Sequence, residues 1–305
     1  MLSYIGRRLA VSVVTLLGVS MIAFALVQLL PGDPARTIAG LLASPAEVEN
    51  VRQRLGLDRS LPVQYWQFIS NVLQGDLGIS ARTRRPVATE LAVRLPKTIE
   101  LAAVGTILGS VVGIVGGVIA ARFRNRFTDH AISMGSLFGI SMPVYWLGLL
   151  LILVFAVNLG WLPAAGADRR TSIILPAVTI GLFTVALVAR MTRASMLEVL
   201  EQDYVRTAVA KGAINTSVVY RHALRNAFIP VLTVIGIQFG SLLGGAVLTE
   251  FVFAWPGIGR LLVDSIFARD FPMVQGIILV FALMFIVVNL IVDILYSYIN
   301  PKITF

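Results

Sequence analysis

The first long segment of the sequence, Leu9–Leu30, is predominantly apolar and carries no charged side chain. A helix needs about 20 consecutive apolar residues to cross the hydrocarbon core of a bilayer. The composition agrees with such a use, because 57% of the residues are hydrophobic and 13% are charged, against roughly 45–50% and about 25% in soluble proteins. The chain is therefore expected to be an integral membrane protein, and soluble, disordered and fibrous classes are excluded.

Six segments have the length and polarity of membrane-spanning helices. They are Leu9–Leu30, Thr98–Ala121, Ala131–Val157, Ile173–Ala189, Ala227–Thr249 and Pro272–Ile299. Pro143, near the middle of the third segment, is expected to kink its helix because proline removes a backbone hydrogen bond. The first segment is longer than the roughly 7–15 apolar residues of a signal-peptide core, so we interpret it as an uncleaved anchor.

Positive side chains set the expected orientation. The net charge of +9 does not form the basic face of a nucleic-acid-binding protein, because the arginines lie between apolar segments. Arg7 and Arg8 precede the first span, Arg122, Arg124 and Arg126 lie between the second and third, and further basic residues follow the fourth. Lys and Arg gather in cytoplasmic loops, so both chain ends are predicted to be cytoplasmic.

The segment Pro31–Lys97, expected on the outer side, has the signals of a folded helical loop. Ser44-Pro45-Ala46-Glu47 is a capping box, and Gly56 marks where that helix would stop. Ser60 can cap a second helix, which Gly75-Asp76-Leu77-Gly78 ends. The apolar stripe of the second helix consists of Tyr65, Trp66, Phe68, Ile69, Val72 and Leu73. The loop is expected to cover the mouth of the bundle, to dock an external protein, or to do both.

The segment Arg190–Asn226, expected on the cytoplasmic side, is far longer than a connection of the usual ~2–8 residues. Its pattern predicts two helices around Gly212. The first would carry Leu197, Leu200, Tyr204 and Ala208 on one face. Such an amphipathic hairpin suits the groove of a partner protein. Packing under its own bundle is the alternative that the pattern leaves open.

Glycines at four-residue spacing mark two of the spans. They are Gly105, Gly109, Gly113 and Gly117 in the second span, and Gly236, Gly240 and Gly244 in the fifth. Small residues at this spacing let helix backbones approach closely in lipid. Both stripes are therefore predicted to be packing faces.

Polar groups inside the spans are few. Asp293 is the one deep ionisable side chain, and Gln238 and Asn289 are uncharged polar positions. Intramembrane ionisable groups are costly and usually functional. All three residues are candidates for lining a translocation path, although structural pairing explains them as well. So little charge inside the spans disfavours an ion-driven pump.

The chain lacks the signatures of an enzyme. No G-x-S-x-G, H-E-x-x-H or P-loop motif occurs, no cysteine is present, and both histidines, His130 and His222, lie outside the spans. No catalytic residue and no metal ligand is therefore assigned. A process driven by nucleotide would need a separate subunit to bind ATP.

The inner segment contains Asp203–Gly212, with the letters DYVRTAVAKG, and Arg221–Asn226, with the letters RHALRN. These stretches resemble the E-A-A loop of bacterial binding-protein-dependent ABC importers. The generic loop has Glu-Ala-Ala, three residues and then Gly, whereas Arg206-Thr207-Ala208 precede Gly212 here. Leu224-Arg225 stands where Leu-Pro closes the generic loop. These departures are typical of the branch that serves dipeptides, oligopeptides, nickel and glutathione.

Further motifs extend the resemblance over nearly the whole chain. In order they are Leu30–Pro34, Leu55–Asp58, Gly75–Gly78, Phe253–Gly259, and Asp293–Tyr296 with Asn300-Pro301. Within the branch, Gly160–Pro163, Gly166–Asp168 and Leu261–Ser265 are most similar to the permeases of glutathione importers.

The resemblance implies an all-α integral membrane protein with the type I ABC importer permease fold, six transmembrane helices and a multi-pass place in the bacterial inner membrane. It also implies a second homologous permease chain, two ABC ATPase subunits that bind ATP and magnesium, and an extracytoplasmic substrate-binding protein. No cofactor is implied on this chain. The residues expected to contact an ATPase are Asp203, Tyr204, Arg206, Thr207, Ala208, Lys211, Gly212, His222, Leu224, Arg225 and Asn226.

The implied organisation has three parts. Residues 1–30 are the cytoplasmic N-terminus and first span, 31–97 the extracytoplasmic helical loop, and 98–305 the permease core, with the coupling hairpin at 190–226. The chain would form half of a translocation pathway for dipeptides, oligopeptides or glutathione. A stand-alone channel or secondary carrier is the alternative, although it would have no use for the hairpin. Nickel or another small solute is an alternative cargo for the same role.

Overall fold

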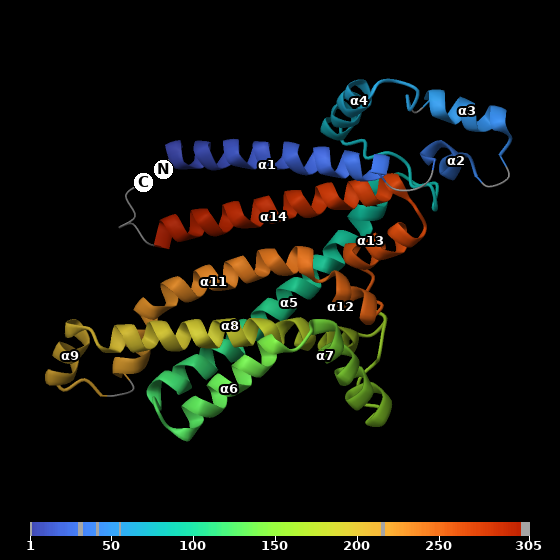
Figure 1. Cartoon of the computed structure of the whole chain (residues 1–305). Helices are drawn as coiled ribbons and strands as arrows, with labels where there is room; N and C mark the ends of the chain where they lie inside the picture. The colour runs from blue at the N-terminus through green and yellow to red at the C-terminus, as the bar shows by residue number, and fades with distance from the viewer. Residues whose placement is uncertain (1, 30–32, 41–42, 55, 215–216, 300–305) are drawn as a thin grey trace. The chain divides into compact units, whose positions relative to one another are not determined.

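The computed structural model describes residues 2–29, 33–40, 43–54, 56–214 and 217–299, and these are almost entirely helical (Figure 1). The elements are α1 (Leu2–Leu29), α2 (Pro34–Ala39), α3 (Pro45–Arg54), α4 (Leu61–Leu73), α5 (Val87–Arg122), α6 (Phe127–Ser141), α7 (Val144–Leu151), the π-helix η1 (Ile152–Asn158), the 3-10 helix η2 (Arg170–Ile173), α8 (Ile174–Leu200), α9 (Asp203–Ala210), the π-helix η3 (Val218–Ala223), α11 (Leu224–Gly245), α12 (Val247–Val252), α13 (Ile258–Phe267) and α14 (Phe271–Ile299). The chain divides into two compact units, Met1–Lys97 with Gly257–Ile286, and Thr98–Pro256 with Val287–Phe305.

Five helical segments of the described chain are long and apolar enough to cross a membrane. They are Gly6–Gln28, Val87–Arg122, Arg170–Leu200, Leu224–Gly244 and Phe271–Ile294. The remaining predicted span corresponds to α6 followed by α7 and η1, and counting this bent pair as one span gives the six that the sequence predicts. The second span is longer than its apolar part, because α5 begins at Val87, well before Thr98.

The third predicted span is broken rather than kinked. The helices Phe127–Ser141 and Val144–Asn158 meet at 104°. Met142 between them is extended, with φ −86° and ψ 135°, because the residue before a proline is pushed out of the helical region. The bend at Pro143 is therefore sharper than the kink that the sequence predicts. Pro143 is the N-cap of a new helix, which begins at Val144.

The predicted capping box is confirmed at the start of α3. The Ser44 backbone N–H and its Oγ donate to Glu47 Oε2 at 2.7 and 2.9 Å, and Glu47 N–H reaches Ser44 Oγ at 3.4 Å. The hydrogen bond from the Ser44 backbone, together with the one from its side chain, lowers the pKa of Glu47. Gly56 follows this helix in the left-handed region, with φ +66°, as the sequence predicts.

Helix α4 also lies where the sequence predicts, although Ser60 makes no side-chain cap bond. Phe24 of α1 contacts the rings of Tyr65 and Phe68 with centroids 5.6 and 6.0 Å apart. Trp66 and Leu73, assigned to the same stripe, are 74% and 83% exposed. Only part of the predicted apolar stripe is therefore used against α1.

In the unit Thr98–Pro256 with Val287–Phe305, α8 packs on α11 and α6 (Figure 1). The glycine stripe of α5 is confirmed as a packing face, because a Cβ at each of its four positions would come within 2.5–2.8 Å of α8. In α11, a Cβ at Gly236 would lie 2.5 Å from Val292 and one at Gly240 would lie 3.3 Å from Val288. Gly244 has nothing within 4 Å, so the fifth-span stripe ends one glycine earlier than predicted.

Candidate functional site

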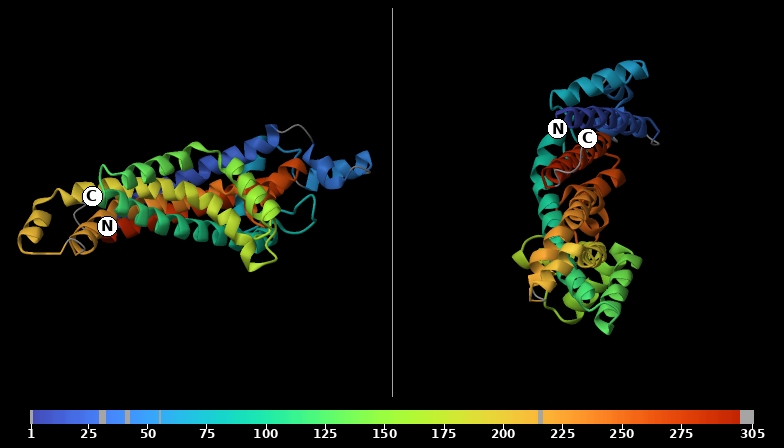
Figure 2. Two further views of the ribbon diagram at one scale, coloured as in Figure 1. Left: turned by 90° about the horizontal axis from the view of Figure 1, so that it is seen from below. Right: turned by 90° about the vertical axis from the view of Figure 1, so that its left-hand side faces the viewer.

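The hairpin expected to act on a partner lies between α8 and α11, at the end of α8 (Figure 1 and Figure 2). Helix α8 continues to Leu200, so the first part of the predicted hairpin is the end of this long helix. A turn at Glu201 and Gln202 follows, in which Gln202 is extended, and α9 then begins at Asp203.

This turn corrects one sequence prediction. Leu197 and Leu200 belong to α8, whereas Tyr204 and Ala208 belong to α9. The four residues therefore do not share one helical face. Helical spacing continues across the turn by coincidence, because only two residues separate the helices and the polar run Glu201-Gln202-Asp203 gives no strong stop signal.

Gly212 ends α9 as the sequence predicts. Its φ is +86°, a conformation that L side chains rarely adopt. The Gly212 N–H donates to Val209 O at 2.9 Å, and the Ala213 N–H donates to Ala208 O at 3.1 Å. These bonds satisfy the last carbonyls of the helix in the way that left-handed C-caps do. The glycine therefore sets the turn at the tip of the hairpin.

Helix α9 presents a polar outer face. Asp203 and Arg206 are highly exposed and form a long ion pair of 3.8 Å, which is worth little at such exposure. Thr207 Oγ1 donates to the Asp203 carbonyl at 2.9 Å, and Lys211 is exposed. Ala208 is half-buried. Most of the residues predicted to contact an ATPase are thus available to a partner.

The inner side of α9 is tied to α11. Asn226 Nδ2 donates to Tyr204 Oη at 2.7 Å. Leu224 is half-buried and Arg225 is exposed. His222 belongs to η3, and its side chain lies outside the described part of the chain. The structure therefore brings together the two predicted contact stretches, Asp203–Gly212 and Arg221–Asn226, at one end of α8.

The base of the hairpin is an apolar cluster. Val219 and Ala223 of η3 pack with Met196 of α8, together with Val118 and Ala121 of α5. A π-helix such as η3 is rare, and such segments are frequent at functional sites. The cluster therefore joins the hairpin to two long helices, α5 and α8.

Two ion pairs hold the helices around this base. Arg193 of α8 makes a bidentate bond to Asp129 of α6, with 2.6 Å from Nε and 2.7 Å from Nη2. Arg124 Nη1 donates to Glu201 at 2.7 Å, which joins the α5–α6 turn to the start of the hairpin. A bidentate guanidinium–carboxylate pair fixes orientation as well as distance.

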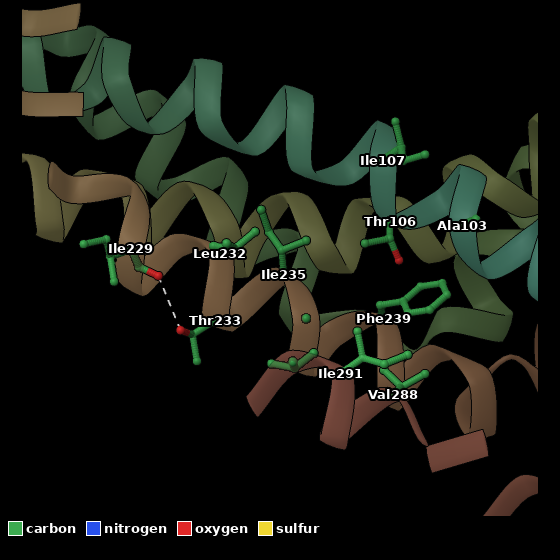
Figure 3. A pocket seen from close by; sticks show the side chains of 12 residues that line it. Ala103, Thr106, Ile107, Ile229, Leu232, Thr233, Ile235, Phe239, Val288 and Ile291 are labelled. Atoms are coloured by element: carbon green, nitrogen blue, oxygen red, sulfur yellow. Dashed lines mark hydrogen bonds between the residues drawn. The ribbon is translucent and has the colours of Figure 1, made fainter. Parts of the chain in front are cut away.

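A pocket lies between α5, α11 and α14 (Figure 3). The parts of these helices that line it belong to the candidate membrane spans. Its volume is about 340 Å³ and its lining is almost wholly apolar. Thr106 Oγ1, on its wall, is buried without a hydrogen-bond partner, whereas Thr233 Oγ1 donates to Ile229 O at 3.3 Å. The residues that line it are Ala103, Thr106, Ile107, Ile229, Leu232, Thr233, Ile235, Gly236, Phe239, Val288, Ile291 and Val292.

None of the three predicted path residues lines this pocket. Gln238 is buried in α11, and Asn289 and Asp293 are half-buried in α14. Asn289 Oδ1 lies close to Gly240, at 3.8 Å from the place of a Cβ there. The structure thus places Gln238 on α11 and both Asn289 and Asp293 on α14, and their role in a path stays a prediction.

Sequence reasoning missed a buried acid at the end of the fifth apolar segment. Glu250 of α12 is 0% exposed, and it accepts a hydrogen bond of 2.6 Å from Thr98 Oγ1. Glu250 lies beyond the candidate span Leu224–Gly244, so it is an acid buried in the protein and not a second acid within a span. Glu250 directly follows the fifth apolar segment, which ends at Thr249, and this position at a span boundary was the available signal.

Glu250 also belongs to a tightly bonded turn. The Trp255 N–H donates to the Glu250 carbonyl at 2.8 Å, and the Gly166 N–H donates to the Phe253 carbonyl at 2.9 Å. Ala254 has φ +49°, which is unfavourable for a residue with a Cβ. Trp255 and Phe253 are buried. The turn therefore gathers α5, α12 and the loop after η1 around one buried carboxyl group.

The described residues contain no group of three His, Cys, Asp or Glu side chains that could hold a metal ion. The geometry thus offers an exposed helical hairpin on a rigid base and an apolar pocket.

Comparison with known proteins gives two family matches. The family described as binding-protein-dependent transport system inner membrane component matches residues 113–305. The N-terminal part of membrane components of binding-protein-dependent transport systems matches residues 1–102. Together they account for nearly the whole chain.

Among curated proteins, the chain is 51% identical over 305 residues to the glutathione transport system permease protein GsiC of Escherichia coli K12, covering 100% of both chains. The protein of the same name from Shigella dysenteriae serotype 1 is also 51% identical, with 100% of both chains covered.

Among solved structures, the chain resembles the MetNI methionine ABC transporter in an inward-facing conformation, with a TM-score of 0.59 and 18% identity. That match covers 69% of this chain and 96% of the other. A chain of an amino acid ABC transporter with histidines matches with a TM-score of 0.56 and 15% identity, covering 69% and 94%. At these identities the likeness concerns the fold alone.

Proposed function

Because the chain belongs to the family of binding-protein-dependent transport system inner membrane components, we propose that it is one of two homologous permease chains of an ATP-driven importer of glutathione or short peptides. It is a multi-pass permease subunit of the inner membrane with a type I ABC importer permease fold. Two ATPase subunits bind ATP and magnesium, and an extracytoplasmic binding protein delivers the cargo. Both chain ends lie in the cytoplasm, and no nucleic acid is involved.

One observation carries the proposed cargo. The identity of 51% extends over the full length of this chain and of a relative named for glutathione transport. Because the match is not confined to a single conserved segment, the outer loop, the spans and the hairpin are all included in the similarity. A glutathione-like cargo is therefore favoured over nickel or another small solute.

The hairpin supplies the link to the ATPases in this proposal. Its tip around Gly212 and the exposed face of α9 enter a cleft of one ATPase, and the apolar base around Met196 and Val219 carries the motion to α5 and α8. The chain itself forms and breaks no covalent bond. Its part of the work is mechanical, a coupling between nucleotide state and the opening of the pathway.

The proposed cargo is tested by uptake of radiolabelled glutathione and of a radiolabelled dipeptide in cells with and without this gene. Deletion is expected to abolish glutathione uptake, and restoring the gene is expected to recover it. Loss of dipeptide uptake alone would keep the importer role and replace glutathione as its cargo. Unchanged uptake of both, in cells shown to lack other importers for them, would contradict the proposal.

A further inference from the structure

A short loop before α5 carries three arginines and is closed on itself. Ile79 and Pro86 form an isolated antiparallel bridge. Inside it, the Ser80 N–H donates to Arg85 O at 2.9 Å, and the Arg84 N–H donates to Ser80 O at 3.0 Å. Arg82, Arg84 and Arg85 are exposed. We refer to Ser80–Pro86 together with the exposed Arg269 as the arginine loop.

A single buried carboxylate holds this loop. Asp270 is 2% exposed and accepts hydrogen bonds from Ser80 Oγ, from the Ala81 N–H at 3.0 Å and from the Arg82 N–H at 3.3 Å. Its Oδ1 also accepts from the Met273 N–H at 3.4 Å, at the start of α14. Asp270 therefore joins the arginine loop to the beginning of a long helix, so the loop is rigid before any partner arrives.

The backbone of the arginine loop is strained at two of its arginines. The described chain has four residues other than glycine with positive φ, and two of them are Arg84 (φ 58°) and Arg269 (φ 54°). Glycine would take these conformations without steric cost. Strained residues of this kind persist at functional sites, where the surroundings enforce them. Arg269 directly follows the C-cap of α13, where a left-handed residue commonly ends a helix, and Arg84 lies within the closed loop.

The charge of the arginine loop is largely uncompensated. Within the described residues, Arg82, Arg84 and Arg269 form no ion pair. Arg85 reaches Glu90 only at 3.8 Å, and Glu90 is already bonded to Arg94. The carboxylate of Asp270 is occupied by donors from the loop and from α14. The arginine loop thus presents exposed guanidinium groups that are available to bind an external anion.

We propose that the arginine loop is the docking point for an acidic surface of the extracytoplasmic binding protein, an assignment that rests on the proposed function. A soluble protein has to find and orient itself on this permease in each cycle, and prearranged charges of one sign raise association rates and fix orientation. Guanidinium groups pair with carboxylates in a bidentate fashion, which adds geometric selectivity. The occupant is therefore a face of the binding protein with several Asp or Glu side chains.

The test measures docking of the glutathione-loaded binding protein to the complete transporter in nanodiscs of phosphatidylcholine, at low and at physiological salt. The double variant Arg82→Gln/Arg84→Gln is expected to weaken docking about tenfold at low salt, mostly through slower association. Its salt dependence should also be flatter, because fewer charges are left to screen. Arg84→Lys keeps the charge and is expected to lose less.

The matched control is Arg59→Gln. Arg59 is an exposed arginine of the same outer segment, and it forms no ion pair within the described residues. It lies outside the arginine loop, so docking should stay at the wild-type level. An equal loss in Arg59→Gln would show that overall charge is responsible, and would overturn the assignment of the arginine loop.

The variant Asp270→Asn tests whether docking depends on the anchored arrangement of the arginine loop or only on its net charge. The change removes a negative charge, so charge counting alone predicts tighter docking to an acidic partner. Because the carboxylate holds the loop in place, our proposal instead expects weaker docking. Tighter docking in this variant would overturn the proposal that a prearranged loop is recognised.

Two further results would overturn the docking assignment in favour of another anion. Unchanged docking of Arg82→Gln/Arg84→Gln with a raised KM for glutathione would assign the loop to carboxylates of the cargo. A loss seen only in nanodiscs with phosphatidylglycerol would assign it to lipid headgroups. Wild-type transporter that docks the binding protein but imports no glutathione would refute the proposed cargo and leave the docking result standing.

Discussion

At the scale of single residues, the buried acid Glu250 shows how a carboxyl group is accommodated in the interior of this protein. Moving an unpaired carboxyl group out of water is costly. Here the group is fully buried and accepts a bond from Thr98 Oγ1, and the main chain of the same residue accepts one from Trp255. The acid therefore holds α12 and the turn after it against α5.

Replacing Glu250 tests this role. Glu250→Ala leaves Thr98 Oγ1 without this acceptor, and loss of this buried hydrogen bond is expected to lower the free energy of unfolding by about 1–3 kcal/mol. Glu250→Gln keeps an acceptor oxygen and is expected to lose less. The measurement is the thermal unfolding midpoint of the purified protein in detergent. Glu198→Ala, at an exposed acid of α8, is the control, and an equal fall there would argue against a specific role for Glu250.

At the scale of elements, α5 and α8 pack so closely that a side chain at the glycine stripe of α5 would clash with α8. A Cβ at Gly109 would lie 2.6 Å from the carbonyl oxygen of Gly181 and 2.6 Å from Thr184 Cβ. Because one of these atoms belongs to the backbone, a rotamer change in α8 cannot relieve the clash. The two helices therefore depend on the absence of side chains at this stripe.

Gly109→Val should push α5 and α8 apart. Overpacking of this kind costs about 1–3 kcal/mol or more, and we expect a lower unfolding midpoint and less assembled protein in the membrane. Gly18→Val in α1 is the matched control, because a Cβ at Gly18 meets nothing within 4 Å. A wild-type midpoint for Gly109→Val would contradict the close approach of the two helices.

For the third predicted span, hydropathy found the apolar segment but did not reveal that its helix is broken. Hydropathy treats Ala131–Val157 as one stretch, but the chain bends by 104° between α6 and α7. Proline inside a membrane helix is tolerated when neighbouring helices satisfy the freed backbone groups. The difference between a kink and a break therefore depends on the neighbours of Pro143, which are not local in the sequence.

At the scale of the whole molecule, the hairpin is the proposed input to the transport cycle. In the proposed function, its exposed tip meets an ATPase, and its apolar base, which packs on α5 and α8, moves these helices. The Tyr204–Asn226 bond and the Arg124–Glu201 pair connect the hairpin to α11 and to the α5–α6 turn.

Gly212→Arg is expected to uncouple the transporter. The φ of +86° would cost an L residue about 1–2 kcal/mol, and the long side chain would occupy the tip that enters the ATPase. The chain should still reach the membrane, while glutathione uptake and its stimulation of ATP hydrolysis are both lost. Membrane content by immunoblot, uptake and ATPase activity are the measurements.

Gly160→Arg is the control for Gly212→Arg. Gly160 also has a positive φ, +64°, and open space around it, but it lies in the loop after η1, outside the hairpin. Uptake in this variant should stay near the wild-type level. Normal uptake by Gly212→Arg would contradict the coupling role of the hairpin.

Local signals in the sequence determined the membrane class, the span positions, the capping box at Ser44, the glycine stripe of α5 and the turn at Gly212. Each of these depends on groups within a few residues of one another, or on the general cost of exposing polar groups to lipid. The resemblance of the hairpin and of the other motifs to a family of importers could also be recognised in this way, and the comparisons bear it out.

Only the tertiary structure decided which elements meet. It identified α8 as the partner of the glycine stripe, Thr98 as the partner of Glu250, and Asp270 as the anchor of the arginine loop. Ser80 and Asp270 lie 190 positions apart in the chain, so no local pattern relates them. Packing of distant segments creates such contacts, because a buried charge is stable only where the folded chain brings its donors together.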